Sequence, residues 1–271
     1  MMNDPQVQAL IYRIEHDDSV DYSNARPDSW DMDEFRVSAD GLQVRFDLHE
    51  HHANEKDARE AIAEYIRAWE FRAQLKHGPN GFSLRFEEAV VVDRNPDPVD
   101  WNHVPLRASG RGGRETAGGR LTVTSKPDSY PSPSADIVLS ADAESMHRRY
   151  MGYRTQREPL PGMAFFCLSV LEDPEERSKE RVSRKRKAAA QRLNVDEDVL
   201  AKVGHLSSTS GGTEARKREG IDKPLGSLER RFLEAAIKRL ILRVAERAAI
   251  PGGDLAQIKA VGSSLFAGAS R

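Results

Sequence analysis

Short runs of alternating apolar and polar residues in the first hundred positions predict β-strands. Leu10, Tyr12 and Ile14 fall on one face of such a run. The other face is also apolar, since it holds Ala9 and Ile11. We therefore expect this strand to be well covered.

A second pattern predicts a β-hairpin. Residues 35–37 lead to Asp40-Gly41, a pair that accepts the positive φ angles of a tight turn. Strict alternation follows, as expected for a strand with one buried face, in Leu42, Val44, Phe46 and Leu48.

A helix is predicted next, beginning at Glu55, because Asn54 suits the N-cap position. Apolar residues then recur at helical spacing and form a stripe that can cover a sheet face: Ile62, Tyr65, Ile66, Trp69 and Ala73. Gly and Pro at 78–81 end the helix, and alternation from Phe82 into the apolar run 89–92 predicts another strand.

The second half has helical periodicity. Residues 95–135 are rich in Gly and Pro, with one expected strand at 121–124, and 137–139 are expected to form a last short strand. Apolar stripes then predict helices around 163–171 and 199–206, a long helix at 227–249 and a short tail helix from Asp254. The predicted class is α+β: an antiparallel sheet with one long helix, followed by a helical bundle.

Charge divides the chain in the same way. Residues 1–100 hold 11 Lys and Arg against 22 Asp and Glu, while residues 101–271 hold 30 against 21. We therefore predict an acidic α+β module at 1–94, an insertion or linker at 95–135 and a basic helical domain at 136–271. Such asymmetry lets the halves attract each other or gives each an outside partner.

A cytoplasmic protein is expected. Cys167 is the single cysteine and lies in an apolar run, so it predicts neither an internal disulfide nor a reactive thiol. The start lacks the basic and apolar segments of a signal peptide, and the apolar stretch 160–171 is shorter than a membrane span.

The densest feature is a basic cluster at 177–192, with eight cations and one acid. On a helix, such side chains are placed to contact phosphates, although a solvated face paired with the acidic half is an alternative interpretation. No aromatic residue interleaves the cluster, which disfavours a single-strand stacking platform. The predicted anion contacts here are Arg181, Arg184, Lys185, Arg186 and Lys187.

A small-residue segment at 207–213 leads into Arg216, Lys217 and Arg218. Its backbone amides and hydroxyls are suited to binding an anion, while a plain connection is the competing interpretation. The order of a P-loop is absent.

His49 and His51 are the metal-ligand candidates, because alternate residues of a strand share a face. Two ligands do not make a site, and His16 with Asp17 contributes only if its strand ends beside the hairpin. A polar strand end is the alternative, and the sequence predicts no cofactor. Tyr150, Tyr153 and Arg154 are expected to serve in packing.

Residues of about 140–250 resemble the HEPN family of helical bundles, found in prokaryotic RNases and defence systems. The resemblance rests on the apolar helix 163–172, a basic helix, a polar loop near Gly211-Gly212 and the closing helix 227–249. Family RNases use a nearby Arg and His, and here such pairs, Arg72 with His77 and Arg45 with His51 or His52, lie outside this region. The resemblance therefore implies a bundle for binding or dimerisation.

The sequence favours a non-catalytic binding or regulatory protein, in a prokaryotic defence-type system if the HEPN resemblance holds. Its basic helices would engage nucleic acid or an acidic protein surface, with no membrane partner. Two alternatives remain open: a nuclease effector, HEPN-like or metal-dependent, and a structural subunit of a homo-oligomer.

Overall fold

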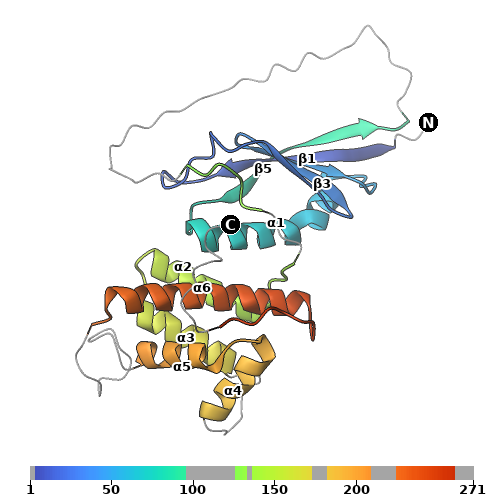
Figure 1. Cartoon of the computed structure of the whole chain (residues 1–271). Helices are drawn as coiled ribbons and strands as arrows, with labels where there is room; N and C mark the ends of the chain where they lie inside the picture. The colour runs from blue at the N-terminus through green and yellow to red at the C-terminus, as the bar shows by residue number, and fades with distance from the viewer. Residues whose placement is uncertain (1–3, 96–125, 133–135, 173–181, 209–223, 260–271) are drawn as a thin grey trace. The chain divides into compact units, whose positions relative to one another are not determined.

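The computed structural model describes residues 4–95, 126–132, 136–172, 182–208 and 224–259. They form an antiparallel sheet with a long helix, and a set of five further helices (Figure 1). The predicted α+β class is confirmed. Within these ranges, no helix combines the length and the apolar character that a bilayer crossing requires.

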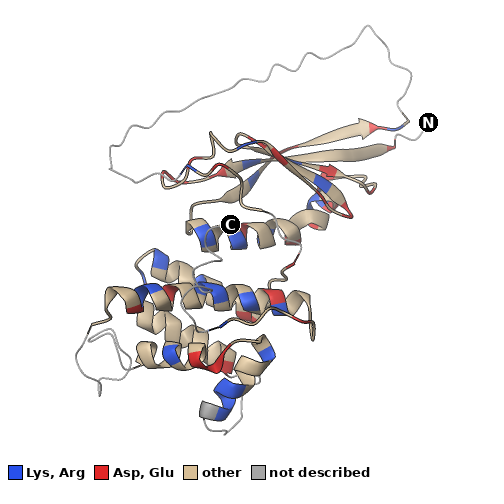
Figure 2. Cartoon of the chain, viewed as in Figure 1, with Lys and Arg blue, Asp and Glu red and all other residues tan. Residues whose placement is uncertain are grey.

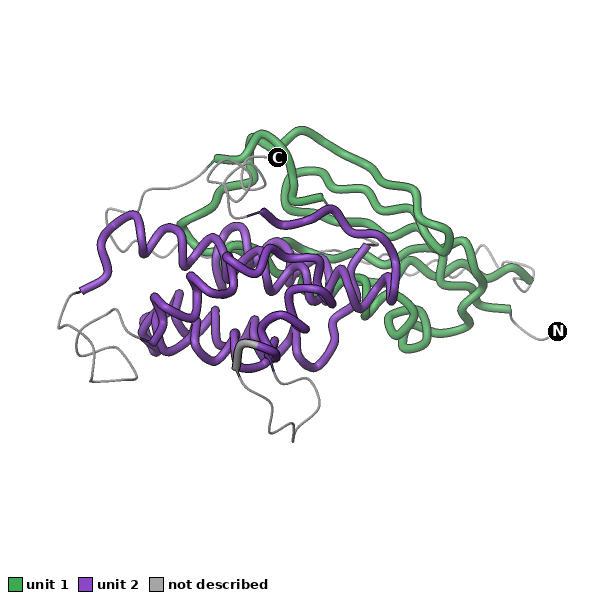
Figure 3. The backbone as a smooth tube through the Cα atoms, turned by 60° about the horizontal axis from the view of Figure 1, so that its bottom comes forward, with its two compact units in different colours: residues 1–66, 80–132 green, residues 67–79, 133–271 purple. Residues whose placement is uncertain are grey.

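The chain divides into two compact units, shown in separate colours in Figure 3. The first contains residues 1–66 and 80–132, and the second contains 67–79 and 133–271. These bounds differ from the expected segments, because residues 67–79 group with the helices and no separate unit corresponds to the expected linker at 95–135. Ala68, Phe71 and Leu75 are buried in the helical core, which accounts for that difference.

The sheet of the first unit has the strand order β2-β3-β4-β1-β5. Its strands are β1 (Pro5–Glu15), β2 (Asp28–Asp31), β3 (Phe35–Asp40), β4 (Gln43–Leu48) and β5 (Ser83–Asp93). β1 lies inside the sheet and pairs antiparallel with both β4 and β5. The expected coverage of β1 is confirmed, since Leu10, Ile11 and Tyr12 are all buried.

The predicted hairpin is also confirmed. β3 pairs with β4 from Phe35 opposite Leu48 to Asp40 opposite Gln43. Gly41 has a φ of 59°, which a glycine adopts without the strain that a Cβ would bring. β2 was not predicted, because its four residues carry no apolar alternation.

Helix α1 (Glu55–His77) begins where the sequence indicates. Asn54 caps it, since its Oδ1 accepts a hydrogen bond from the amide of Asp57 at 3.0 Å. Gly78 follows the helix with a φ of 105°. In the first unit, Tyr65 of α1 packs edge-on against Phe35 and Phe46, so this part of α1 covers a sheet face.

The second unit holds α2 (Ala141–Arg154), α3 (Leu160–Glu172), α4 (Val182–Leu193), α5 (Glu197–Ser208) and α6 (Ser227–Ala249). α3 contributes seven buried residues to the core, and α6 contributes a buried stripe that includes Leu233, Ile237 and Ile241. The long predicted helix at 227–249 is confirmed at both ends.

Two expected elements are wrong. Residues 137–139 form no strand; the amide of Val138 donates instead to the carbonyl of Ala245, in the last turn of α6. The described residues from Asp254 form no helix either. Ile258 is instead buried and forms an isolated parallel bridge with Val195. The expected strand at 121–124 lies outside the described residues.

Candidate polyanion interface

Helix α4 carries the described part of the basic cluster. Ala189, Ala190 and Leu193 are buried in the core of the second unit and hold the helix by one face. Asn194 follows with a φ of 50°, a left-handed conformation in which asparagine often ends a helix. The side chain of Arg243, buried on α6, donates to the carbonyl of Leu193 at 2.8 Å. The end of α4 is thus anchored to α6.

Arg184 and Lys187 of α4 are exposed to solvent, and so is Arg192 near the end of the helix. Arg184 and Lys187 are three residues apart, so they are neighbours on the helix surface. Within the described part of the chain, neither forms an ion pair with a carboxylate. Figure 2 shows that α4 has Lys and Arg but no acidic residue along its length. Its outward face is therefore positive.

Arg186, by contrast, points inward. Its Nε lies 2.7 Å from Oε1 of Glu172 at the end of α3, and the two side chains are 21% and 14% exposed. The guanidinium also lies close to Gly204 of α5, where a Cβ would come within 2.7 Å of Nη2. Sequence reasoning missed Glu172, because no local pattern links residues 14 positions apart.

Of the other predicted anion contacts, one lies among the described residues and four lie outside them. Lys185 is half-buried and already interacts with another group. Arg181, Arg216, Lys217 and Arg218 lie outside the described residues, as does most of the 207–213 segment. Their role in anion binding stays a prediction.

The two histidine candidates contact different segments of the first unit. β4 ends at Leu48, so the expected placement of His49 and His51 on one strand face is wrong. Nδ1 of His49 lies 3.0 Å from the carbonyl oxygen of Asp33, whereas Nε2 of His51 lies 3.4 Å from Asp4. The described residues contain no group of three or more His, Cys, Asp or Glu placed to hold a metal ion.

Tyr150, Tyr153 and Arg154 form a polar network with α6. Tyr150 donates to Glu234 at 3.1 Å, Tyr153 donates to the other carboxylate oxygen at 3.4 Å, and Arg154 lies 3.7 Å from Glu234. Burial raises the pKa of both tyrosines, so they remain neutral donors. The network joins α2 to α6 and agrees with the expected packing role.

The Arg–His pairs outside the HEPN-like region also have ordinary surroundings. Nε of Arg45 lies 2.7 Å from Oδ1 of Asp47, two residues along the same strand β4. Burial, together with Lys76 and Lys238, lowers the pKa of His77 to about 4, so this imidazole is neutral near pH 7. Cys167 is buried in the helical core, and burial raises the pKa of its thiol. A reactive thiolate is therefore not expected.

Comparisons with protein-family models, with curated proteins and with solved structures give no match. The helices α3, α4 and α6 occur in the order on which the HEPN resemblance rests. The resemblance itself stays a prediction.

Proposed function

We propose that the helical unit binds nucleic acid through the outward face of α4, as a non-catalytic binding or regulatory component. The observation that carries this proposal is the exposure of Arg184 and Lys187 on a helix that has no acidic residue. Each phosphate that such a cation neutralises releases a counterion, so binding gains free energy and becomes sensitive to salt. The contact is with the backbone and carries no sequence information by itself.

Packing limits the size of this interface. Arg186 is matched by Glu172, and the Nη2 of Arg192 donates to the carbonyl of Leu171 at 2.8 Å. Among the described α4 cations, Arg184 and Lys187 are thus the exposed ones that form no hydrogen bond or ion pair with the described part of the chain. Binding that rests on these two side chains is weak, and the slope of log affinity against log salt is about two, since each phosphate contact contributes about 0.9. Cations outside the described residues would add to the affinity if they take part.

The test is a charge reversal at the two exposed positions. Fluorescence anisotropy with a 20-base-pair duplex, measured from low to moderate salt, should give at least about tenfold weaker binding for Arg184→Glu/Lys187→Glu at the lowest salt. The slope of log affinity against log salt should fall by about two, since each lost phosphate contact removes about 0.9 from it.

Arg148→Glu/Arg231→Glu is the matched control, because both positions are exposed on other helices and the change in net charge is the same. It should leave most of the affinity in place. Equal losses in the two double variants would refute a local interface. Tighter binding of poly-glutamate than of the duplex, lost in the same Arg184→Glu/Lys187→Glu variant, would favour an acidic protein partner instead.

The assay also separates binding from the nuclease alternative. Intact RNA and DNA on a denaturing gel, after incubation with and without divalent cations, would agree with a non-catalytic component. Cleavage that survives the α4 charge reversal would favour an enzyme.

A second candidate is self-association through β5, which supports the homo-oligomer alternative. Among the described strands, β5 pairs only with β1 and forms an edge of the sheet. Val91 and Val92 on this edge are 54% and 45% exposed. An unpaired apolar edge is a template for pairing with another chain.

The charges along β5 suit antiparallel pairing with β5 of a second copy of the chain. Antiparallel pairing centred on Val91 would place Val90 opposite Val92 of the copy and Glu88 opposite Arg94, so both ends of the contact carry opposite charges. Light scattering across concentration should show a dimer that Val91→Lys dissociates, while Val138→Lys, at an exposed valine of the other unit, leaves it intact. A monomer at all concentrations would exclude this candidate.

A further inference from the structure

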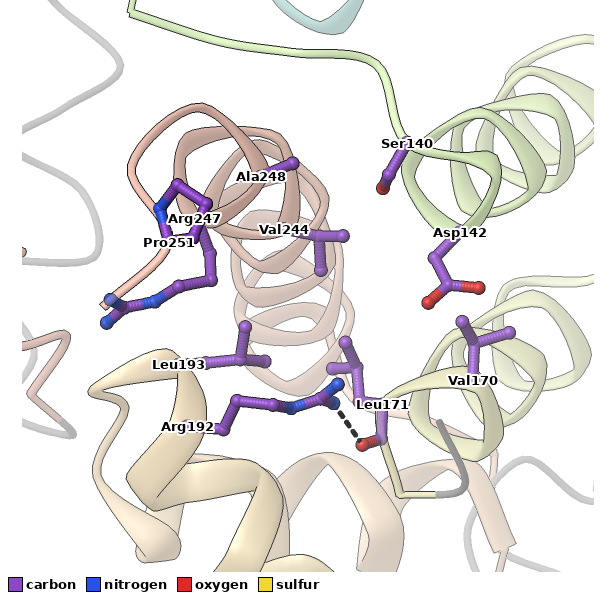
Figure 4. A pocket seen from close by; sticks show the side chains of 10 residues that line it. All are labelled: Ser140, Asp142, Val170, Leu171, Arg192, Leu193, Val244, Arg247, Ala248 and Pro251. Carbon is purple, nitrogen blue, oxygen red and sulfur yellow. Dashed lines mark hydrogen bonds between the residues drawn. The ribbon is translucent and has the colours of Figure 1, made fainter. Parts of the chain in front are cut away.

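A groove of about 290 Å³ opens in the helical unit, near the start of α2 and the ends of α3, α4 and α6 (Figure 4). This volume lies just below the range of small-molecule pockets, which is about 300–1,000 Å³, so only a small ligand would fit. Much of its wall is apolar, with Val170 and Leu171 from α3, Leu193 from α4 and Val244 from α6. A small ligand with an apolar body would fit this wall.

Arg192 supplies a cation on one side. Figure 4 shows its guanidinium directed into the groove beside Leu171, whose carbonyl accepts a hydrogen bond from Nη2 at 2.8 Å. Burial lowers the pKa of this guanidinium. A guanidinium has five N–H donors, and within the described residues no carboxylate lies within ion-pair distance of Arg192. Donors remain for an outside anion.

Asp142 supplies an anion on the facing wall. It lies in the first turn of α2, and Figure 4 shows its carboxylate directed into the same groove. The cap of α2 is Ser140, whose Oγ accepts from the amide of Ala143 at 3.3 Å. Because Ser140 performs the capping, the carboxylate of Asp142 remains available for a ligand.

The groove thus places opposite charges on facing sides, with an apolar wall beside them. Asp142 favours the charged form of Arg192, yet the two side chains do not form a direct ion pair. A ligand that completes this arrangement carries an anion toward Arg192, a cationic donor toward Asp142 and an apolar group toward Val170 and Val244. A simple carboxylate or a simple amine completes only half of it.

We propose that this groove binds an α-amino acid with an apolar side chain, its carboxylate on Arg192 and its ammonium on Asp142. The charges balance, so neither partner is buried against an unmatched charge. The stem of Arg247 borders the same groove, and its Nη1 is engaged by the carbonyl of Gly253 at 2.7 Å. Figure 4 shows the guanidinium of Arg247 directed away from Asp142, whereas that of Arg192 is directed into the groove, so Arg192 is the recognition group for the carboxylate. This proposal is independent of nucleic-acid binding on the outer face of α4.

The test is an NMR titration of the full chain with L-leucine, followed by two analogues that each lack one charge. L-Leucine should shift the backbone amides of Val170, Leu171 and Val244 in a saturable way. 4-Methylpentanoate, which lacks the ammonium, and 3-methylbutylamine, which lacks the carboxylate, should each bind at least about tenfold more weakly. Glycine, which lacks the apolar group, should also bind more weakly.

Variants supply the second arm. Arg192→Gln and Asp142→Asn should each weaken leucine binding at least about tenfold, while Arg231→Gln, at an exposed position near the start of α6, should leave it unchanged. If Arg192→Gln impairs folding, the analogue series on the unmodified chain still tests whether the groove recognises both charges of the ligand. Absence of saturable shifts up to about 20 mM leucine, or equal binding of leucine and either analogue, would overturn the proposal.

Discussion

The lysine and arginine side chains of helix α4 have different surroundings in this protein. Arg184 and Lys187 reach solvent, Arg186 pairs with Glu172, and Arg192 points into a groove. Arg243 on α6 is 1% exposed and donates to the carbonyls of Leu193 and Ala256. Packing, rather than residue type, decides which positive charges are available to a partner.

At the same scale, we predict that His147 makes stability depend on pH. Burial lowers the pKa of His147 to about 4 from its ordinary 6.5. Between these values the unfolded chain binds a proton that the folded chain does not, so the free energy of unfolding falls as pH falls from 6.5 toward 4. Near the middle of this window, His147 alone should lower the free energy of unfolding by about 1.4 kcal/mol for each unit by which the pH falls.

His147→Phe should therefore flatten the fall in unfolding free energy between pH 6.5 and 5, measured by urea denaturation. The ring of His147 already packs on Phe71 with centroids 4.7 Å apart, so an apolar ring suits the site. His77, whose pKa is also lowered by burial, should supply part of the remaining slope. His205→Gln, at an exposed position of α5, is the control. Identical slopes in the wild type and His147→Phe would contradict the prediction.

At the scale of elements, the contact of α4 with α5 depends on a glycine. A Cβ at Gly204 would approach Nη2 of Arg186 to 2.7 Å and Cδ2 of Leu168 to 3.1 Å. Glycine in a helix interior costs about 1 kcal/mol relative to alanine, so its presence here reflects the space that the Arg186–Glu172 pair occupies.

We predict that Gly204→Ala destabilises the protein by about 1–3 kcal/mol, because overpacking at the contact outweighs the gain in helix propensity. Urea denaturation measures the change. When Arg186→Ala is already present, the cost of Gly204→Ala should be smaller, since the crowded guanidinium is gone. Gly152→Ala is the matched control on α2, where the nearest side chain lies 3.6 Å from the added Cβ, and it should be neutral or stabilising. If the losses of unfolding free energy from Gly204→Ala and Arg186→Ala are strictly additive in the double variant, the crowding of Gly204 by Arg186 is not the cause.

At the scale of the whole molecule, α1 belongs to both compact units. Its residues up to Ile66 group with the sheet, and those from Arg67 onward group with the helices. The helix lies in the N-terminal part of the sequence, yet Phe71 is buried among residues of the second unit.

We predict that Phe71→Ala lowers stability by about 3–5 kcal/mol and that the loss appears in the helical unit. Hydrogen–deuterium exchange of the full chain should accelerate in α2 and α6 before it changes in β3 and β4. Phe46→Ala, which removes a fully buried ring of the sheet, should give the opposite order. Faster exchange in the sheet alone after Phe71→Ala would refute the assignment of this part of α1.

The sequence by itself determined the α+β class, the hairpin, the start of α1 and the bounds of α6. These features follow from local signals: alternation, helical spacing, a capping asparagine and turn glycines. Tertiary structure decided the rest, because it depends on residues distant in sequence. The backbone of Val138 bonds to Ala245, and that of Ile258 bonds to Asn194 and Asp196, so distant partners rather than local pattern fix these two segments. The pairing of Arg186 with Glu172 and the meeting of Asp142 with Arg192 across one groove arise from packing, which no local pattern records.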